Sequence, residues 1–195
     1  MRKALDKSGF ETVVFSYKSR TTTILNTSKA LFLQIKSENP ESFSLITHSL
    51  GGLIARGLLT YSENAPDFPK IKSVVMIAPP NQGTIAGNFM NKYAIFKLIM
   101  GVNLRDVMND KESLAKKLPI DFNANVGIIA GLRGKKSGYN PFIGEDNDGE
   151  IRPQETRLGT EDDFITIKAN HLSILRKEET IRQTLHFLKI GNFEH

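Results

Sequence analysis

Short apolar segments alternate with longer amphipathic segments along the chain. The short segments are rich in β-branched and aromatic residues, which is typical of strands buried on both faces, and they cover residues 12–15, 43–46, 74–77, 126–129 and 164–167. The longer segments carry apolar residues at helical spacing and cover residues 24–35, 50–61, 85–100 and 172–188. This alternation predicts an α/β fold, a three-layer α/β/α sandwich with a mostly parallel sheet.

We expect a single domain over residues 1–195, because no repeat, linker or low-complexity tract divides the sequence. Residues 131–149 contain five glycines among other turn formers, and they predict a long loop of the kind that often carries function. Residues 85–118 begin with a segment that is apolar around much of its circumference. This region is a candidate helical cap or lid with an acyl-chain wall, and the alternative is a plain buried helix.

Composition excludes several classes of function. The chain has 26 Lys and Arg against 21 Asp and Glu, a net charge of +5 that is not gathered in one stripe, so nucleic acid is not an expected partner. No apolar run approaches the roughly 18 to 20 residues of a membrane helix, and no signal core follows Met1, which favours a soluble, cytoplasmic protein. The absence of Cys excludes disulfides, a thiol nucleophile and Cys-ligated metals.

The sharpest chemical signal lies at residues 46–52, where a strand runs into a helix with Ser49 at the corner. The pattern resembles the nucleophile elbow G-x-S-x-G, in which a tight turn lifts the Ser side chain above the sheet edge. Gly51 and Gly52 meet the need for small neighbours, but Thr47 stands where the motif has its first Gly. The alternative is a Ser that only caps the following helix.

A Ser nucleophile needs a His that takes its proton. Of the four His residues, His48 adjoins Ser49 and should point elsewhere, His186 lies inside the last predicted helix, and His195 ends the chain. His171 lies between the last strand and the last helix, where the sheet edge would bring it beside Ser49. We therefore predict His171 as the base; the alternative is a loop or capping His.

The triad acid should precede the His, on the loop after the preceding strand. Residues 145–150 supply an acidic run. Asp148 is the first choice, because Gly149 after it allows the chain to double back, and Asp146 is the reserve. A solvated acidic loop or a calcium loop is the alternative, but Gly144 would occupy the first calcium-ligand position without a side-chain oxygen. We therefore expect no metal site here.

The chain resembles small bacterial α/β-hydrolases of the esterase and lipase type. The resemblance rests on the order Ser49, Asp148, His171 and on the stretches at 47–52, 78–83, 147–149 and 184–188, and it extends over nearly the whole chain. It implies cleavage of carboxylic esters through an acyl-enzyme: Ser49 attacks, His171 shuttles the proton and Asp148 holds the imidazole. It implies no metal or organic cofactor.

The same resemblance raises a question about the oxyanion hole. One donor should be the backbone N–H of Leu50. In the family the second donor comes from a loop that precedes a helix corresponding here to the one that begins at Met1. The loop and its strand are therefore expected to be missing, which would leave a gap beside strand 43–46 and make the chain N-terminally short. Loss of one such donor can cost about 10² to 10³ in turnover.

The sequence says less about which residues bind the substrate. The turn at Pro80, Asn81 and Gln82 follows a strand at the same sheet edge, so these residues are candidates for lining the pocket, or for a rigid turn only. We expect a small-molecule ester or lipid as substrate. Two alternatives remain open: a catalytically silent scaffold that binds a lipid or protein partner, and an acyltransferase that uses the same triad.

Overall fold

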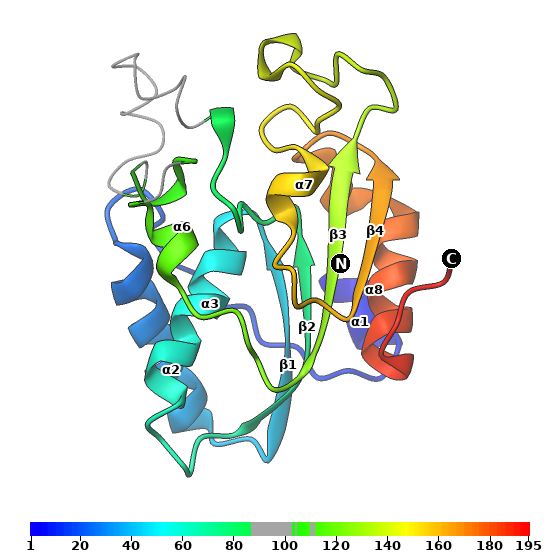
Figure 1. Ribbon diagram of the computed structural model, residues 1–195. Coiled ribbons are helices and arrows are strands. Elements are labelled where there is room, and N and C mark those ends of the chain that lie inside the picture. The colour runs from blue at the N-terminus through cyan, green and yellow to red at the C-terminus, as the bar shows by residue number, and fades with distance from the viewer. Residues whose placement is uncertain (87–102, 104, 110–111) are drawn as a thin grey trace.

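The protein is built around a parallel sheet (Figure 1). The computed structural model describes residues 1–86, 103, 105–109 and 112–195. In this part of the chain the sheet has four strands in the order β1-β2-β3-β4, all parallel. Their bounds are β1 Ser42–His48, β2 Lys70–Ile77, β3 Asn125–Leu132 and β4 Asp163–Lys168. Each contains a predicted strand, because each includes a short segment rich in β-branched and aromatic residues.

Helices cover both faces of this sheet, which gives the three-layer α/β/α fold predicted from the sequence. One face carries α2 and α3, and the other carries α1 and α8 (Figure 1). Their bounds are α1 Arg2–Lys7, α2 Ile24–Glu38, α3 Leu50–Ser62 and α8 Glu178–Ile190. The shorter helices are η2 Arg105–Val107, α6 Leu114–Lys117, η3 Pro141–Ile143, α7 Pro153–Thr156 and η4 Ser173–Arg176.

The core has two parts, one on each face of the sheet. In β2, Val74 and Met76 pack with α2 and α3, whereas Val75 and Ile77 pack with α8. Successive side chains of a strand point to opposite faces, so a strand buried on both faces has no polar alternation. Because all strands are parallel, their carboxyl ends lie at one edge of the sheet, where the candidate residues are gathered.

The predicted strand at 12–15 is wrong. These residues form no strand, and Val13 and Val14 are 62% and 59% exposed. In the described part of the chain β1 pairs with β2 alone, and residues 12–15 form no ladder with its open edge. Only Phe15 of this segment packs against the core, where it stacks on Tyr17.

The predicted helix at 172–188 is interrupted. It consists of η4 and α8, separated at Lys177, whose backbone is extended. The break places Glu178 and Glu179 in the first turn of α8, where negative charge is favourable to the helix dipole. The predicted helix at 85–100 falls almost wholly outside the described residues, as does much of the candidate cap at 85–118. Among the described helices, none has the length and apolar content needed to cross a membrane.

Candidate active site

Ser49 lies at a sharp corner between β1 and α3. Its backbone has φ 52° and ψ −124°, a conformation that is strained for a residue with a side chain. The Ser49 N–H donates to the carbonyl of Ile77 at 3.0 Å, which ties the corner to the end of β2. The Ser49 side chain makes no capping bond to α3. Ser49 therefore occupies a sharp strand-to-helix turn, and its side chain is not used to cap the helix.

The glycines after Ser49 permit a close approach of helix and sheet. A Cβ on Gly52 would lie 2.6 Å from Cβ of Pro79, so only glycine fits there without a shift. A Cβ on Gly51 would lie 3.4 Å from Cβ of Thr47, an ordinary contact. Thr47 is thus accommodated in place of the usual glycine, although its buried hydroxyl has no hydrogen-bond partner among the described residues.

Ser49, His171 and Asp148 form one continuous hydrogen-bonded chain. Ser49 Oγ lies 2.9 Å from His171 Nε2, and His171 Nδ1 lies 2.7 Å from Asp148 Oδ2. The His171 and Asp148 side chains are 5% and 1% exposed, so water is largely excluded from the link between them. With Asp148 ionised, Nδ1 carries the proton, and this N–H donates a hydrogen bond to the carboxylate. Nε2 is then free to accept a proton from the Ser49 hydroxyl.

The Asp148 carboxylate is held by the turn that follows it. Its Oδ1 accepts the N–H groups of Glu150 and Ile151 at 2.9 and 2.8 Å, which leaves Oδ2 for the imidazole. Gly149 has φ 109°, a conformation that glycine adopts readily and that lets the chain double back. Asp146 lies elsewhere: its carboxylate accepts two backbone N–H groups near the end of β3. The structure thus brings Asp148, and not Asp146, to His171.

Asn147 organises the loop that carries this turn. Its side chain is fully buried, its amide donates to the carbonyls of Asn140 and Glu145, and its Oδ1 accepts the N–H groups of Asn140 and Gly149. All the capacity of one amide is therefore spent inside the loop. The predicted long loop is an ordered structure that includes η3, and it fixes the position of Asp148.

The backbone of His171 is fixed on two sides. Its N–H donates to the carbonyl of Asp148 at 2.8 Å, and its carbonyl accepts from Nε2 of His48 at 2.8 Å. The two imidazole rings lie 4.8 Å apart. His48, which we expected to point away from the site, therefore supports the His171 backbone through the tautomer that carries the proton on Nε2.

The two histidines have opposite pKa shifts. Burial and the neighbouring His171 lower the pKa of His48 to about 4, so it is neutral near pH 7. Burial also lowers the pKa of His171, but the hydrogen bond and charge of Asp148, with a contribution from Glu150, outweigh burial and raise it above its usual value. A neutral His48 adds no repulsion when His171 takes up a proton.

Glu150 lies on the other side of the same imidazole. Its Oε2 is 3.5 Å from His171 Nε2, the nitrogen that also faces Ser49. Sequence reasoning placed this residue in the acidic run without a role, and it missed His48 as well. The signal for Glu150 was its spacing: a tight turn at Asp148 and Gly149 returns the next side chain toward the residue that the Asp contacts.

The backbone N–H of Leu50 is available at the start of α3. Leu50 is the first residue of that helix, and the first N–H groups of a helix have no acceptor within it. The N–H adjoins Ser49 and belongs to the positive end of the helix dipole, so it is suited to an oxyanion. The predicted role of Leu50 as an oxyanion donor stays a prediction.

The turn at Pro80, Asn81 and Gln82 is bound into the framework. Asn81 is 1% exposed; its carbonyl accepts from Arg56 at 3.0 Å and its amide donates to the carbonyl of Thr156 at 2.8 Å. The Gln82 amide donates to another backbone carbonyl near the end of α7, and Pro80 is buried. The three residues follow β2 at the sheet edge, but their bonds serve the scaffold, and substrate binding by them stays a prediction.

Metal ligation receives no support from the described residues. No three His, Asp or Glu side chains in that part of the chain come together as a possible ligand set. The acidic loop that could have suggested calcium uses its oxygens otherwise: Asp146 and Asp148 accept backbone N–H groups, and Glu145 pairs with Arg152 at 2.8 Å.

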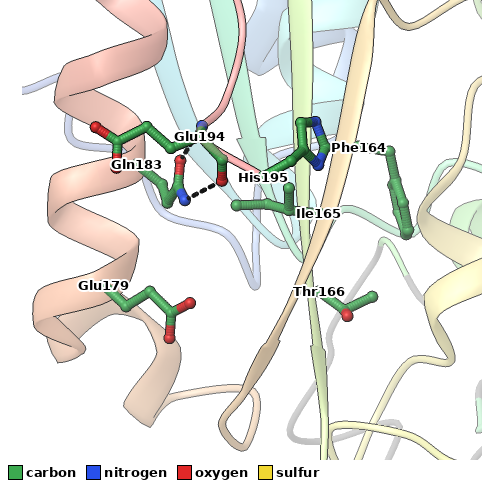
Figure 2. A pocket seen from close by; sticks show the side chains of 7 residues that line it. All are labelled: Phe164, Ile165, Thr166, Glu179, Gln183, Glu194 and His195. Carbon is green, nitrogen blue, oxygen red and sulfur yellow. Dashed lines mark hydrogen bonds between the residues drawn. The ribbon is translucent and has the colours of Figure 1, made fainter.

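A hollow of about 320 Å³ lies elsewhere, between β4, α8 and the C-terminal residues (Figure 2). The Gln183 side chain and the Glu194 backbone form two hydrogen bonds across part of it. The lining consists of Phe164, Ile165, Thr166, Glu179, Gln183, Glu194 and His195, and it includes no member of the Ser-His-Asp chain. The hydrogen-bonded chain at the sheet edge, and not this hollow, therefore marks the candidate active site.

Comparisons with known proteins find a similarity in the fold. No family model and no curated protein sequence matches it. Among solved structures, a mature lipase from Bacillus licheniformis, BlEst2, is 16% identical, with a TM-score of 0.61 over 91% of this chain and 77% of that chain. Phospholipase PlaB from Legionella pneumophila is 19% identical, with a TM-score of 0.61 over 80% of this chain and 40% of that chain.

A third similar structure is an extracellular α/β-hydrolase from a Paenibacillus species. It is 17% identical, with a TM-score of 0.51 over 95% of this chain and 90% of that chain. At such identities the similarity concerns the fold. The chain has the α/β-hydrolase fold, as the resemblance in the sequence implied.

Proposed function

We propose that this protein is a serine hydrolase that cleaves carboxylic esters of small molecules or lipids. The observation that carries the proposal is the hydrogen-bonded chain from Ser49 Oγ through His171 to Asp148. A hydroxyl, an imidazole and a buried carboxylate in this order are the arrangement that activates a Ser nucleophile. The shared fold with a lipase and a phospholipase supports the same class of reaction.

The geometry supports the following reaction. Ser49 Oγ attacks the ester carbonyl while His171 Nε2 takes the hydroxyl proton, and Asp148 stabilises the imidazolium that forms. The Leu50 N–H donates to the developing oxyanion. The imidazolium then gives its proton to the departing alcohol, which leaves an acyl group on Ser49. Water, activated by the same imidazole, releases the acid and restores the free hydroxyl.

Hydrolysis of p-nitrophenyl esters of increasing acyl length tests this proposal. We expect turnover of at least one ester by the parent chain, and a loss of about 10⁴-fold or more in Ser49→Ala, with the circular dichroism spectrum unchanged. Ser44→Ala, at a Ser on β1, the strand that leads to Ser49, is the matched control and should retain the parent rate. Equal rates for the parent and Ser49→Ala would contradict the proposal, and a folded parent chain without turnover would favour a non-catalytic scaffold.

A further inference from the structure

A carboxylate stands where the alcohol part of an ester would leave the site. Glu150 Oε2 is 3.5 Å from His171 Nε2, the atom that hands the proton to the departing alcohol. For that transfer the alcohol oxygen must lie within about 3.2 Å of Nε2. The alcohol oxygen and the Glu150 carboxylate are then at most about 7 Å apart, because both lie next to the same nitrogen. A substituent two or three bonds beyond the oxygen is long enough to reach the carboxylate.

The position of this carboxylate follows from the backbone around it. The Glu150 N–H donates to Asp148 Oδ1 at 2.9 Å, and the Glu150 carbonyl accepts from Thr84 Oγ1 at 2.8 Å. Both backbone groups are thus fixed to elements of the site, and only the side chain is free to adjust. The turn that orients the triad acid therefore also determines where Glu150 points.

The Glu150 side chain is available to a ligand. It is 53% exposed, and in the described part of the chain His171 is its one ionic partner. The neighbouring acids differ in this respect, since Glu145 pairs with Arg152 and Glu155 is buried with the same Arg. Among the described residues no Lys or Arg forms an ion pair with this carboxylate, so it leaves a negative field beside His171.

We propose that Glu150 selects esters whose alcohol part carries a positively charged nitrogen; this inference rests on the function proposed above. The negative charge attracts an ammonium group on the departing alcohol and repels an anionic one. The acyl part of the substrate lies on the other side of the carbonyl and does not determine this preference. Glu150 is thus a specificity residue for the alcohol and not a proton carrier.

A pair of isosteric esters tests the inference. Choline butyrate and 3,3-dimethylbutyl butyrate have the same shape, but only the first has a charged nitrogen in place of the branched carbon. We expect the parent chain to have the higher kcat/KM for choline butyrate. The readout is the ratio of kcat/KM for the two esters within one variant, and in Glu150→Gln this ratio should fall by about fivefold, the upper end of the range for a partly exposed ion pair. Glu145→Gln, which removes the same charge from the same loop, should keep the preference.

The pH profile gives a second readout that a purely structural role would not change. The charged or titratable groups that face the His171 ring are Asp148 and Glu150 from the loop and His48 from β1. Because Glu150 contributes to raising the pKa of His171, its replacement by Gln should move the acid limb of p-nitrophenyl butyrate hydrolysis to lower pH. Asp148 remains in the variant, so the limb should persist.

The outcomes separate this inference from the proposed function. Turnover of p-nitrophenyl butyrate without a preference for the charged ester, or with that preference intact in Glu150→Gln, overturns the role of Glu150 and leaves the hydrolase proposal standing. Failure of the folded parent chain on all three esters overturns both.

Discussion

The two sides of the Ser49 hydroxyl are built differently. On the side of His171 and Asp148, the relay side, backbone and side chains are joined by many bonds: Asp148 accepts two N–H groups, His171 is held at both its N–H and its carbonyl, and Asn147 ties the loop behind them. These residues come after β3, an inner strand, and β4, which forms the other edge of the described sheet.

The opposite side, the oxyanion side, has much less support. β1 is the last strand of the described sheet on that side, and residues 12–15 run past without joining it. The donor expected there is one backbone N–H, that of Leu50 at the start of α3. Thr47 on β1 buries a hydroxyl without a partner in the described residues, which costs about 1 to 3 kcal/mol for such a group.

The structure supports two steps of the proposed reaction to different degrees. Proton transfer from Ser49 depends on groups that are fixed before any substrate arrives. Stabilisation of the oxyanion depends on the first turn of α3 and on how closely that helix approaches β2. Substitutions and the pH profile of the reaction test the two sides separately.

Replacement of the relay acid should have the largest effect. In Asp148→Asn the amide can present its N–H₂ to His171, which favours the wrong imidazole tautomer, and we expect kcat to fall by about 10³ to 10⁴-fold. Asp146→Asn is the matched control on the same loop, with an expected loss below about tenfold, because Asp146 contacts backbone N–H groups alone. Equal losses in steady-state ester hydrolysis would show that the loop, and not the acid at 148, is what matters.

The pH dependence should come second. His171 acts as a base only when neutral, so kcat/KM should fall about tenfold per pH unit below its pKa. Because the pKa of His171 is raised above 6.5, the midpoint of this fall should lie above pH 6.5. His48 has a pKa of about 4 and stays neutral throughout, so it should add no second step between pH 5 and 8. A flat profile over that range would contradict the role of His171.

The smallest effect is expected on the oxyanion side, at the contact between α3 and the end of β2. Gly52→Ala places a Cβ 2.6 Å from that of Pro79, which should lower the free energy of unfolding by about 1 to 3 kcal/mol. The displaced helix carries the Leu50 N–H, so kcat should fall as well. Gly51→Ala, with its nearest contact at 3.4 Å, is the control and should be nearly neutral in urea unfolding. Similar losses in both variants would contradict the close approach at Gly52.

The sequence predicted the relay side better than the oxyanion side for a physical reason. Four strands could be predicted because short runs rich in β-branched and aromatic residues favour strands whatever their partners are, and of these four only β2 and β3 are buried along most of their length. The run at 12–15 has the same composition, but a strand also needs a hydrogen-bonded partner, and its own sequence does not reveal whether it pairs. β1 has an open edge in the described sheet, and residues 12–15 do not pair with it.

Side-chain roles followed the same division. That Ser49, Asp148 and His171 lie together could be predicted because the resemblance gives their order and the ends of parallel strands meet at one sheet edge. Within the acidic run at 145–150, the Gly at 149 favoured Asp148 over Asp146, and Asp148 is the carboxylate that reaches the imidazole. The same turn directs the Glu150 side chain toward Nε2 of His171, whereas Asp148 contacts Nδ1.

The proposed function depends on a reactive Ser49, and covalent labelling measures that reactivity. The folded chain is treated with a fluorophosphonate, its intact mass is measured, and the experiment is repeated on Ser49→Ala and Asp148→Asn. We predict a single adduct on the parent chain, none on Ser49→Ala and much slower labelling of Asp148→Asn. An adduct that persists in Ser49→Ala, or a folded parent chain that takes up no label, would contradict the account.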